Sequence, residues 1–380
     1  MFKIKFCTFF CFVSLYASAQ DNQVANPSVL RSVRTAVPFL LITPDARSGG
    51  MGDAGVALLP DVNSLSNNPS KIAMLEKLDG YALSYTPWIR SLADDMNLVY
   101  LSGFHRLNKE SVIGTSIRYF SLGTFELNNS EGQSLGEYKP NELAIDFTYA
   151  KRFGDDFSLG TTIRYIYSGL FSTQESVSSV SGSNKAFAAD VSAFYKSPTY
   201  LFNKDAIMAF GLNITNIGTK ISYNTNSVKD FLPTNLRAGA SGTFIIDHLN
   251  EFTFALDLNK LLVPSSPLYD LNGNIIAGKN PDRSVPSGIF GSFNDAPGGM
   301  SEEIKEVSIA TGIEYKYNHL FALRAGYFYE SPLKGYKRFL TIGSGLKYEI
   351  FNLDLAYIIG NAARNPLANT LRFTLFLNLK

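Results

Sequence analysis

The sequence predicts an all-β protein, namely a transmembrane antiparallel β-barrel of about 14 strands, preceded by a plug that contains a short helix. Three observations lead to this fold class. Apolar and polar residues alternate along many segments, as they do on the two faces of a strand. These segments have the length that a tilted strand needs to cross a bilayer. The connections between them alternate between short and long, which is typical of outer-membrane barrels.

The N-terminus, residues 1–19, has the pattern of a cleaved signal peptide. Two early lysines precede an apolar run, and a small-x-small site, Ala-Ser-Ala, precedes Gln20. Both cysteines of the chain, Cys7 and Cys11, lie inside this stretch, so the mature chain offers no disulfide, thiolate metal site or cysteine nucleophile. No other apolar run approaches the ~18 residues of a membrane-spanning helix. We therefore expect an exported protein that enters a membrane, if it does, by strands.

The bulk composition argues against some classes of function. The 380 residues carry a formal net charge of +1, which gives no reason to expect nucleic-acid binding, because that needs a basic excess. Charged residues make up 18% of the chain, whereas about 25% is usual in soluble globular proteins. The 29 Phe and 20 Tyr residues far outnumber the single Trp. This mixture favours strands and turns over helices.

Residues 20–78 lack the alternation and are predicted to form an N-terminal periplasmic segment and barrel plug. A glycine cluster within them invites comparison with a phosphate-binding loop, but it lacks the Gly-Lys-Ser/Thr ending and does not follow a strand. A compact loop is one interpretation. The better one is a plug that folds into the barrel mouth and ends in a short helix from Pro69 to Leu75. The glycines of the cluster are Gly49, Gly50, Gly52 and Gly55.

Residues 79–380 are predicted to form the barrel. The C-terminal stretch LRFTLFLNLK shows the pattern, because every second residue from Leu371 to Leu379 is apolar and those between are mostly polar. We expect the apolar faces to contact lipid, with Tyr near the strand ends as an interfacial girdle. A large soluble β-sandwich or solenoid in the periplasm is the alternative. The expected strand centres are Leu83, Tyr100, Ile117, Phe147, Ile163, Ala193, Gly211, Gly239, Leu256, Ile313, Ala325, Ser344, Leu355 and Phe373.

Charged residues fall on the polar face of several expected strands. A lone charge inside a protein core is costly, whereas opposed charges that line a lumen can pair or stay hydrated. This placement therefore favours a barrel over a soluble core. The residues are Arg118, Asp146, Arg164, Asp257, Arg324, Asp354 and Arg372.

The connections predict how the barrel is oriented. Short turns, such as those near Asn108 and Asn318, alternate with long loops. Outer-membrane barrels place the short turns in the periplasm and the long loops outside. A soluble sandwich has no reason to keep every long loop at one end. Both the N- and C-termini are then expected in the periplasm.

The long loops are the expected partner-binding surface. The longest, residues 261–305, carries apolar and aromatic residues among many Pro and Gly, and a loop of this length is uncommon without a task. These residues would either contact a protein partner or pack back over the barrel mouth. The single Trp follows Pro87 and is expected to be an interfacial anchor or a contact for a partner barrel. The candidate partner-binding residues are Trp88, Tyr269, Ile289, Phe290 and Phe293.

The sequence predicts neither a catalytic residue nor a cofactor or metal site. His105, His248 and His319 fall near turns at the expected periplasmic end and lack metal-ligand spacing. Nothing marks a nucleophile elbow. Adjacent acids such as Glu302 and Glu303 are expected to be solvated, with calcium binding as the minor alternative. We therefore expect a protein that is not an enzyme.

Two motifs carry a family resemblance. GGMGDAGVAL followed by DVNSLSNNPSKIA resembles the hatch of FadL-like outer-membrane transporters, which has a Gly/Ala-rich run and then an Asn-Pro step. More particular are SVRTAVPFLLITPDAR and YTPWIRSLADDMNLVYLSGF, which are similar to the PorV family, a FadL-like barrel of the type IX secretion system of Bacteroidota. The resemblance covers nearly the whole mature chain. The residues that it assigns to the plug are Gly49, Gly50, Gly52, Asp53, Gly55, Asn68 and Pro69.

The resemblance implies a non-enzymatic role in the outer membrane. PorV-like proteins bind the folded C-terminal signal domain of exported cargo at the translocon barrel, SprA. They carry it to an attachment complex, where a sortase-like protein, PorU, removes the signal and joins the cargo to lipopolysaccharide. The alternative, from the wider FadL group, is a transporter of hydrophobic small molecules. The expected inward residues are mostly small or polar, which favours the shuttle, although Phe120, Ile166, Phe328 and Ile358 also fall inward.

Overall fold

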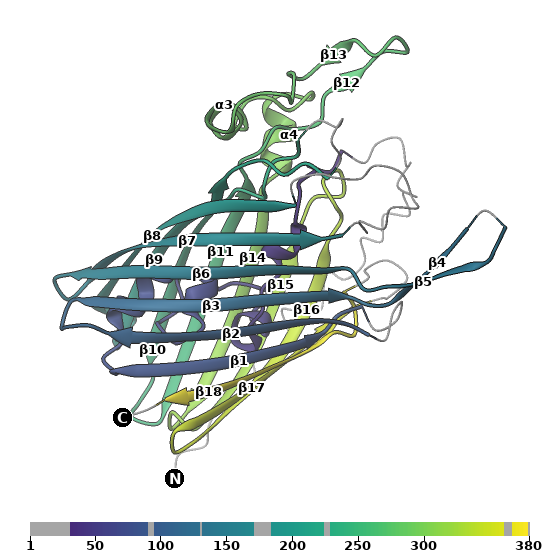
Figure 1. The fold of residues 1–380 in the computed structure, drawn as a ribbon. Helices are drawn as coiled ribbons and strands as arrows, with labels where there is room; N and C mark the ends of the chain where they lie inside the picture. Colours follow the sequence, from purple (N-terminus) through teal and green to yellow (C-terminus); the bar gives the residue numbers. More distant parts are fainter. Residues whose placement is uncertain are drawn as a thin grey trace. The chain divides into compact units, whose positions relative to one another are not determined.

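The part of the chain that the structure describes forms a closed barrel of fourteen antiparallel strands (Figure 1). The structure is a computed structural model, and it describes residues 31–89, 95–129, 131–170, 184–223, 229–360 and 367–378. The ring closes where β1 (Asp79–Pro87) pairs with β18 (Leu371–Asn378). The predicted fold class is confirmed, and each expected strand centre lies in a different barrel strand. The predicted signal peptide and residues 20–30 lie outside the described residues.

The other elements follow in chain order. The barrel strands are β2 (Met96–Arg106), β3 (Ser111–Leu122), β6 (Asn141–Phe153), β7 (Phe157–Gly169), β8 (Lys185–Leu201), β9 (Lys204–Gly218), β10 (Asn235–Ile245), β11 (Asn250–Leu261), β14 (Ser308–Tyr317), β15 (Phe321–Tyr329), β16 (Arg338–Tyr348) and β17 (Phe351–Ile359). Two hairpins outside the barrel pair β4 (Phe125–Asn128) with β5 (Ser134–Tyr138) and β12 (Leu268–Tyr269) with β13 (Ile275–Ala277). The helices are η2 (Pro38–Leu41), α1 (Ala46–Gly49), α2 (Ser64–Asn67), η3 (Pro69–Met74), α3 (Val285–Gly291) and α4 (Met300–Lys305). None of these helices is long and apolar enough to cross a membrane, within the part of the chain described.

Short turns join the strands at one end of the barrel and long loops join them at the other, as the sequence predicts. We call these the short-turn end and the long-loop end. The longest loop, residues 262–307, lies at the top of Figure 1 and carries the β12–β13 hairpin with helices α3 and α4. The short turns are residues 107–110, 154–156, 202–203, 246–249, 318–320 and 349–350.

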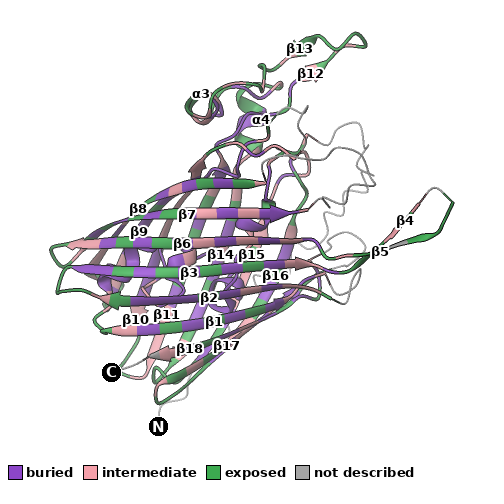
Figure 2. Ribbon diagram, in the orientation of Figure 1, coloured by how far each residue is buried: buried purple, intermediate pink, exposed green. Residues whose placement is uncertain are grey.

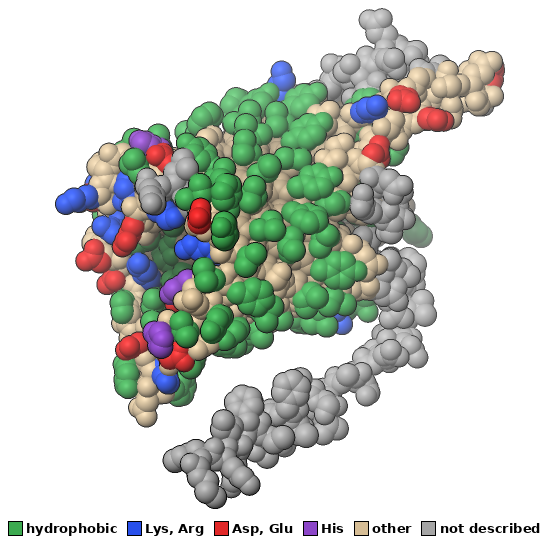
Figure 3. Space-filling view, turned by 90° about the horizontal axis from the view of Figure 1, so that it is seen from below, with side chains coloured by type: hydrophobic (Ala, Val, Ile, Leu, Met, Phe, Trp, Pro, Cys, Tyr) green, Lys and Arg blue, Asp and Glu red, His purple; other side chains and the backbone are tan. Residues whose placement is uncertain are grey.

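Side chains along the barrel strands point alternately into the lumen and outward, which Figure 2 shows as alternating buried and exposed positions. On β6, for example, Phe147 is 65% exposed between the buried Asp146 and Thr148. Outward side chains are mostly hydrophobic and form a broad band in Figure 3, with charged side chains gathered at the short-turn end. All seven charged residues that the sequence placed on inward faces are buried: Arg118, Asp146, Arg164, Asp257, Arg324, Asp354 and Arg372.

Residues 31–78, which we call the N-terminal segment, run through the lumen (Figure 1). At the long-loop end, the Arg31 backbone NH donates to the Leu333 carbonyl at 2.9 Å. At the short-turn end, Asp79 begins β1 opposite His105. The C-terminal strand ends at the short-turn end, as predicted. The N-terminus itself lies outside the described residues, so its expected position in the periplasm stays a prediction.

Candidate functional site

An apolar cluster closes the lumen at the long-loop end. Phe39 of the N-terminal segment stacks on Phe120 of β3 with ring centroids 6.3 Å apart, and Trp88 meets Phe120 edge-on at 6.1 Å. Ile166 and Ile221 belong to the same cluster, and all of these side chains are buried. The inward apolar residues at this end therefore pack against one another and do not line an open conduit.

Trp88 does not occupy the position that the sequence predicts. It continues the inward row of Ser84 and Thr86 on β1, and its side chain is only 7% exposed. Its backbone NH donates to the Met96 carbonyl at 2.9 Å, which extends the pairing of β1 with β2. A buried indole ring neither anchors a barrel at a lipid interface nor makes first contact with a partner. We therefore leave Trp88 out of the partner-binding surface.

The predicted plug glycines lie where the N-terminal segment touches the barrel wall. Gly52 has a φ of +68°, in the left-handed region that favours glycine. It passes against Gly326 of β15, and Met51 passes against Gly312 of β14. A side chain at either wall glycine would overlap the backbone of the segment, so glycine on both surfaces permits this close approach. Gly49 and Gly50 likewise lie against Arg372 and Gly343 of the wall, whereas Gly55 lies against Asn67 and Ser48 of the segment itself.

Carboxylates hold the C-terminal half of the glycine cluster, Asp53 to Val56, against the wall. Asp53 forms an ion pair with Arg372 of β18. One oxygen of Asp257, on β11, accepts the backbone NH of Gly55 at 2.7 Å and that of Val56 at 2.9 Å. Hydrogen bonds to a charged group contribute about 1.5–3 kcal/mol each. Asp257 therefore holds the segment at a set depth in the lumen.

The Asn-Pro step is bonded to β8 of the wall. The Asn68 side-chain amide donates to the carbonyl of Ala193, on β8, at 3.0 Å. Pro69 begins the 3₁₀ helix η3, which is the short helix that the sequence predicts. The backbone NH of Ser70 then donates to Oγ of Ser192 at 3.0 Å. Both halves of the motif that resembles a hatch are thus attached to inward side chains or carbonyls of the barrel.

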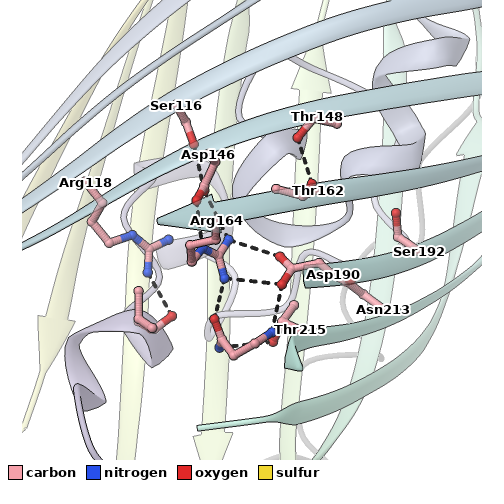
Figure 4. A network of polar contacts seen from close by, with 12 residues as sticks. Ser116, Arg118, Asp146, Thr148, Thr162, Arg164, Asp190, Ser192, Asn213 and Thr215 are labelled. Atoms are coloured by element: carbon pink, nitrogen blue, oxygen red, sulfur yellow. Dashed lines mark hydrogen bonds and ion pairs between the residues drawn. The ribbon is translucent and has the colours of Figure 1, made fainter. Parts of the chain in front are cut away.

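A buried ion network joins neighbouring strands on the lumen side of the wall (Figure 4). Arg164 of β7 donates to Asp146 of β6 at 2.7 Å and to Asp190 of β8 at 3.0 Å. Asp190 also accepts the backbone NH of Asn216 at 2.7 Å, at a bulge in the pairing of β8 with β9. A buried charge is tolerated when it is paired and hydrogen-bonded. These groups satisfy one another, so the network stiffens the wall and does not form a row of free charges for a permeating ion.

A second ion network includes the N-terminal segment itself. Arg47 of α1 donates to Glu314 of β14 at 3.1 Å and to Asp61 at 2.7 Å. Arg324 of β15 donates to the same Glu314 at 2.7 Å and to Asp354 of β17 at 2.7 Å. Removing the segment would leave part of this buried charge unpaired, which costs about 3–5 kcal/mol. The segment is therefore a structural part of the barrel interior.

Two cavities lie inside the barrel among the described residues. A cavity of about 20 Å³ lies near Thr43, Arg118 and Arg237, which is room for very few water molecules. A second cavity of about 250 Å³ lies at the short-turn end. Pockets for small molecules usually measure about 300–1,000 Å³ and are mostly apolar. Neither of these two cavities is the apolar pocket expected of a hydrocarbon channel, because the first is too small and polar side chains line much of the second.

Buried carboxylates hold the longest loop to the barrel. On α4, Glu303 pairs with Lys260 at 2.9 Å and Glu302 pairs with Lys334 at 2.7 Å. Glu306 contacts both lysines, at 2.6 and 2.9 Å. Burial disfavours the charge on Glu306, but hydrogen bonds, first from Lys260, outweigh this and lower its pKa. The prediction that Glu302 and Glu303 are solvated is wrong, because the loop folds both carboxylates against lysines of the barrel and a neighbouring loop.

The same loop exposes hydrophobic side chains. Helix α4 turns its glutamates inward and carries Met300 and Ile304 on its exposed side, while Phe290 on α3 is 80% exposed. Part of the loop does pack back, since Leu262 and Val263 are buried. Exposed apolar patches are typical of interaction sites, and Met300 and Ile304 lie four residues apart on the same helix. We call the following set the loop surface: Tyr269, Ile289, Phe290, Phe293, Met300 and Ile304, all exposed except Ile289, which is half-buried.

The histidines lie at the short-turn end, as predicted. His105 contacts Asp79 at 2.8 Å and His319 contacts Glu251 at 3.5 Å. His248 lies in the turn between β10 and β11. Among the residues described, no group of three or more His, Cys, Asp and Glu is arranged to hold a metal ion.

The fold and interior define a class of protein, an outer-membrane β-barrel whose lumen is filled by its own N-terminal segment. Solved structures share the fold. The TodX deltaS2S3 mutant, a monoaromatic hydrocarbon channel, is 13% identical, with a TM-score of 0.51 over 88% of this chain and 99% of that chain. The toluene transporter TodX of P. putida is 11% identical, with a TM-score of 0.50 over 89% and 98%. Such low identity establishes the fold alone, and no curated protein matches significantly.

The chain belongs to the PorV family. The model of the type IX secretion system protein PorV matches residues 25–268, which is more than half of the chain. The resemblance carried by the N-terminal motifs is thereby confirmed. The protein is accordingly an outer-membrane component of a type IX secretion system.

Proposed function

We propose that this protein binds the folded C-terminal signal domain of type IX cargo through the loop surface. It receives the cargo at an SprA-like translocon barrel and carries it to an attachment complex with a PorU-like sortase. The observation that carries the proposal is a contrast between two parts of the molecule. The lumen is filled and ion-paired, whereas the longest loop is firmly anchored and exposes Phe290, Met300 and Ile304.

Anchoring is what makes the loop suited to this role. A flexible loop loses conformational entropy when a partner orders it, and that loss weakens binding. Here Lys260 and Lys334 hold α4 through buried carboxylates before any partner arrives. The apolar side chains are therefore presented on a preformed scaffold. Aromatic and Met side chains are also the types that protein interfaces favour.

The alternative function, transport of hydrophobic small molecules, has less support. It requires an apolar pocket and a path past the N-terminal segment. Asp257, Arg47 and Asn68 tie that segment to the strands, and the enclosed cavity near Arg118 measures about 20 Å³. We therefore propose that the N-terminal segment serves as a permanent plug. Cargo binding and hand-over involve no covalent step, so we infer that the protein works without catalysis or a cofactor.

The proposed orientation places the long-loop end outside the cell and the C-terminus in the periplasm. The loop surface then faces the side on which cargo emerges, and the hydrophobic band contacts outer-membrane lipid. This orientation follows the usual arrangement of outer-membrane barrels, which have short periplasmic turns and longer external loops.

A pull-down from native outer membranes tests the proposal. The tagged protein should be recovered in mild detergent with a very large barrel and with secreted proteins that still carry their C-terminal signal domain. Phe290→Asp places a charge in the loop surface and should lower cargo recovery more than about tenfold, because buried aromatic anchors dominate interface energies. Asn272→Asp, which adds the same charge at an exposed position of the same loop, should leave recovery unchanged.

Two outcomes would contradict the proposal. One is a clean monomer that carries only lipid or fatty acid, which would favour the transporter. The other is equal cargo recovery by wild type, by Phe290→Asp and by a variant without residues 262–307. Heat-modified mobility on gels should accompany each variant to show that its barrel is folded.

A further inference from the structure

The cavity of about 250 Å³ at the short-turn end is a candidate site that the proposed function does not use. It lies between the N-terminal segment, at Pro60 to Val62, and the wall of β14 to β17. His319 and Leu320, in the turn between β14 and β15, contribute to its lining near the mouth. The N-terminal segment therefore forms one wall of the cavity and the barrel strands form the other.

The deep wall of this cavity carries charges that are already paired. Arg47 and Arg324 both bind Glu314, as described above, and Lys316 reaches the same carboxylate at 3.2 Å. Three cations therefore face three carboxylates there. The cations are Arg47, Lys316 and Arg324, and the carboxylates are Asp61, Glu314 and Asp354.

Lys347 adds a positive charge that is not balanced. It lines the cavity from β16, and it takes part in none of the ion pairs formed among the described residues. Lys77, just before β1, lies near enough that the charge of Lys347, after burial, lowers the pKa of Lys77. Two like charges repel each other. An anion placed beside Lys347 would relieve this repulsion.

Part of the remaining wall of the cavity is apolar. Val62, Ala322 and Phe376 line it, and all three are buried. A small inorganic ion would leave these side chains unfilled. A carboxylate that belongs to a chain with a neighbouring apolar residue would use both parts, because its charge would lie beside the lysines and its hydrocarbon would be buried.

We propose that this cavity binds a carboxylate of a polypeptide segment together with an adjacent apolar side chain. The carboxylate, either the C-terminal one or that of an Asp or Glu, lies beside Lys347 and Lys316. The apolar side chain packs against Val62 and Phe376. In the proposed orientation the cavity faces the periplasm, so the segment comes from a periplasmic partner. This cavity is separate from the loop surface, and cargo binding at the loop surface does not depend on the cavity.

Short acetylated peptides in solution test this site on the full-length mature protein in lipid nanodiscs. Acetyl-Leu-Phe with a free C-terminal carboxylate, its C-terminal amide, and acetyl-Glu-Phe-amide are titrated by calorimetry. At least one of the two carboxylate peptides should bind at least about tenfold more tightly than the uncharged amide, because hydrogen bonds to charged groups are the stronger ones. A preference for the first peptide identifies a chain terminus as the natural ligand, and a preference for acetyl-Glu-Phe-amide identifies an acidic side chain.

Lysine variants show whether binding occurs in this cavity. Lys347→Gln should weaken carboxylate binding about tenfold, and Lys347→Arg should largely retain it. The matched control is Lys109→Gln, which removes an exposed lysine from the β2–β3 turn at the same end of the barrel. Equal binding of acid and amide, absence of binding by all three peptides, or equal loss in Lys109→Gln and Lys347→Gln would overturn the proposal. Lys347 is exposed, so its replacement should leave the barrel folded.

Discussion

Gly326→Ala should displace the N-terminal segment from the lumen while leaving the strands paired. A methyl group at this position would lie 2.7 Å from Met51 Cα and closer still to the backbone of Gly52. Because these neighbours are backbone atoms, they cannot rotate away as a side chain would. Overpacking of this kind costs about 1–3 kcal/mol, and we expect the upper part of that range. A difference of about 3 kcal/mol raises the population of detached segment roughly 100-fold.

Gly242→Ala is the matched control for this variant. Both glycines lie in barrel strands, but the nearest atom to a methyl at position 242 is Met208 Sδ at 3.2 Å, at the end of a flexible side chain. Alanine in a strand is favoured over glycine by about 0.5–1 kcal/mol, so this change should be neutral or slightly stabilising. Hydrogen exchange of the backbone over residues 46–57 measures the difference. Equal exchange in wild type, Gly242→Ala and a folded Gly326→Ala barrel would refute close docking of the segment.

Three further outcomes are expected. Lys260→Met should release α4, because two buried carboxylates lose their partner, which costs about 3 kcal/mol of stability. Proteolysis of the longest loop should then accelerate roughly 100-fold. Lys305→Met, on the exposed side of α4, should leave the rate of proteolysis unchanged. The folded-state pKa of Glu306 is below its ordinary 4.5, so its stabilising contribution is complete above that value and is lost as pH falls through the lowered pKa. A spin label at Ser301→Cys should therefore stay immobile at neutral pH and become mobile only at a pH below 4.5. The fluorescence of buried Trp88 should be blue-shifted and insensitive to brominated lipids, and strong quenching would place it at the interface instead.

The barrel strands could be predicted because the pattern that identifies each of them lies within its own few residues. A strand with one face in lipid and one in a lumen must alternate apolar and polar residues, as LRFTLFLNLK does. The same alternation identified the inward charges, such as Arg164 and Asp257, before their partners were known. Their partners could not be identified, because Asp146 and Asp190 meet Arg164 only through the register of adjacent strands.

The course of the N-terminal segment could not be predicted from the sequence. Its glycines and Asn-Pro step indicated a plug, and the structure places them against the wall. Nothing local determined that Arg31 lies at the long-loop end, since that depends on contacts such as the one with Leu333. Trp88 was misplaced for a similar reason. It follows Pro87, at which β1 ends, so the sequence suggests a loop residue. In the structure Trp88 continues the inward row of Ser84 and Thr86 and is buried like them.

The anchor of the longest loop was missed, although a signal for it exists. Lys260 falls on the apolar row of β11, two residues after the exposed Leu258. A lysine in a row that otherwise contacts lipid requires a cover or a partner. Acidic residues of the following loop, such as Glu303, were available to supply it. A search for charges that break an apolar row would therefore find loop anchors of this kind from sequence.

The course of the N-terminal segment restricts how the barrel is assembled. The segment leads directly into β1, and β1 is one side of the seam that β18 closes. Contacts at Asp257, Asn68 and Arg47 hold the segment inside the ring of strands. The segment could not pass through the lumen to reach these positions once the ring had closed. The segment therefore has to be in place while the sheet is still open. Strand β18 then closes the ring on β1 around residues 31–78, which the other strands already surround.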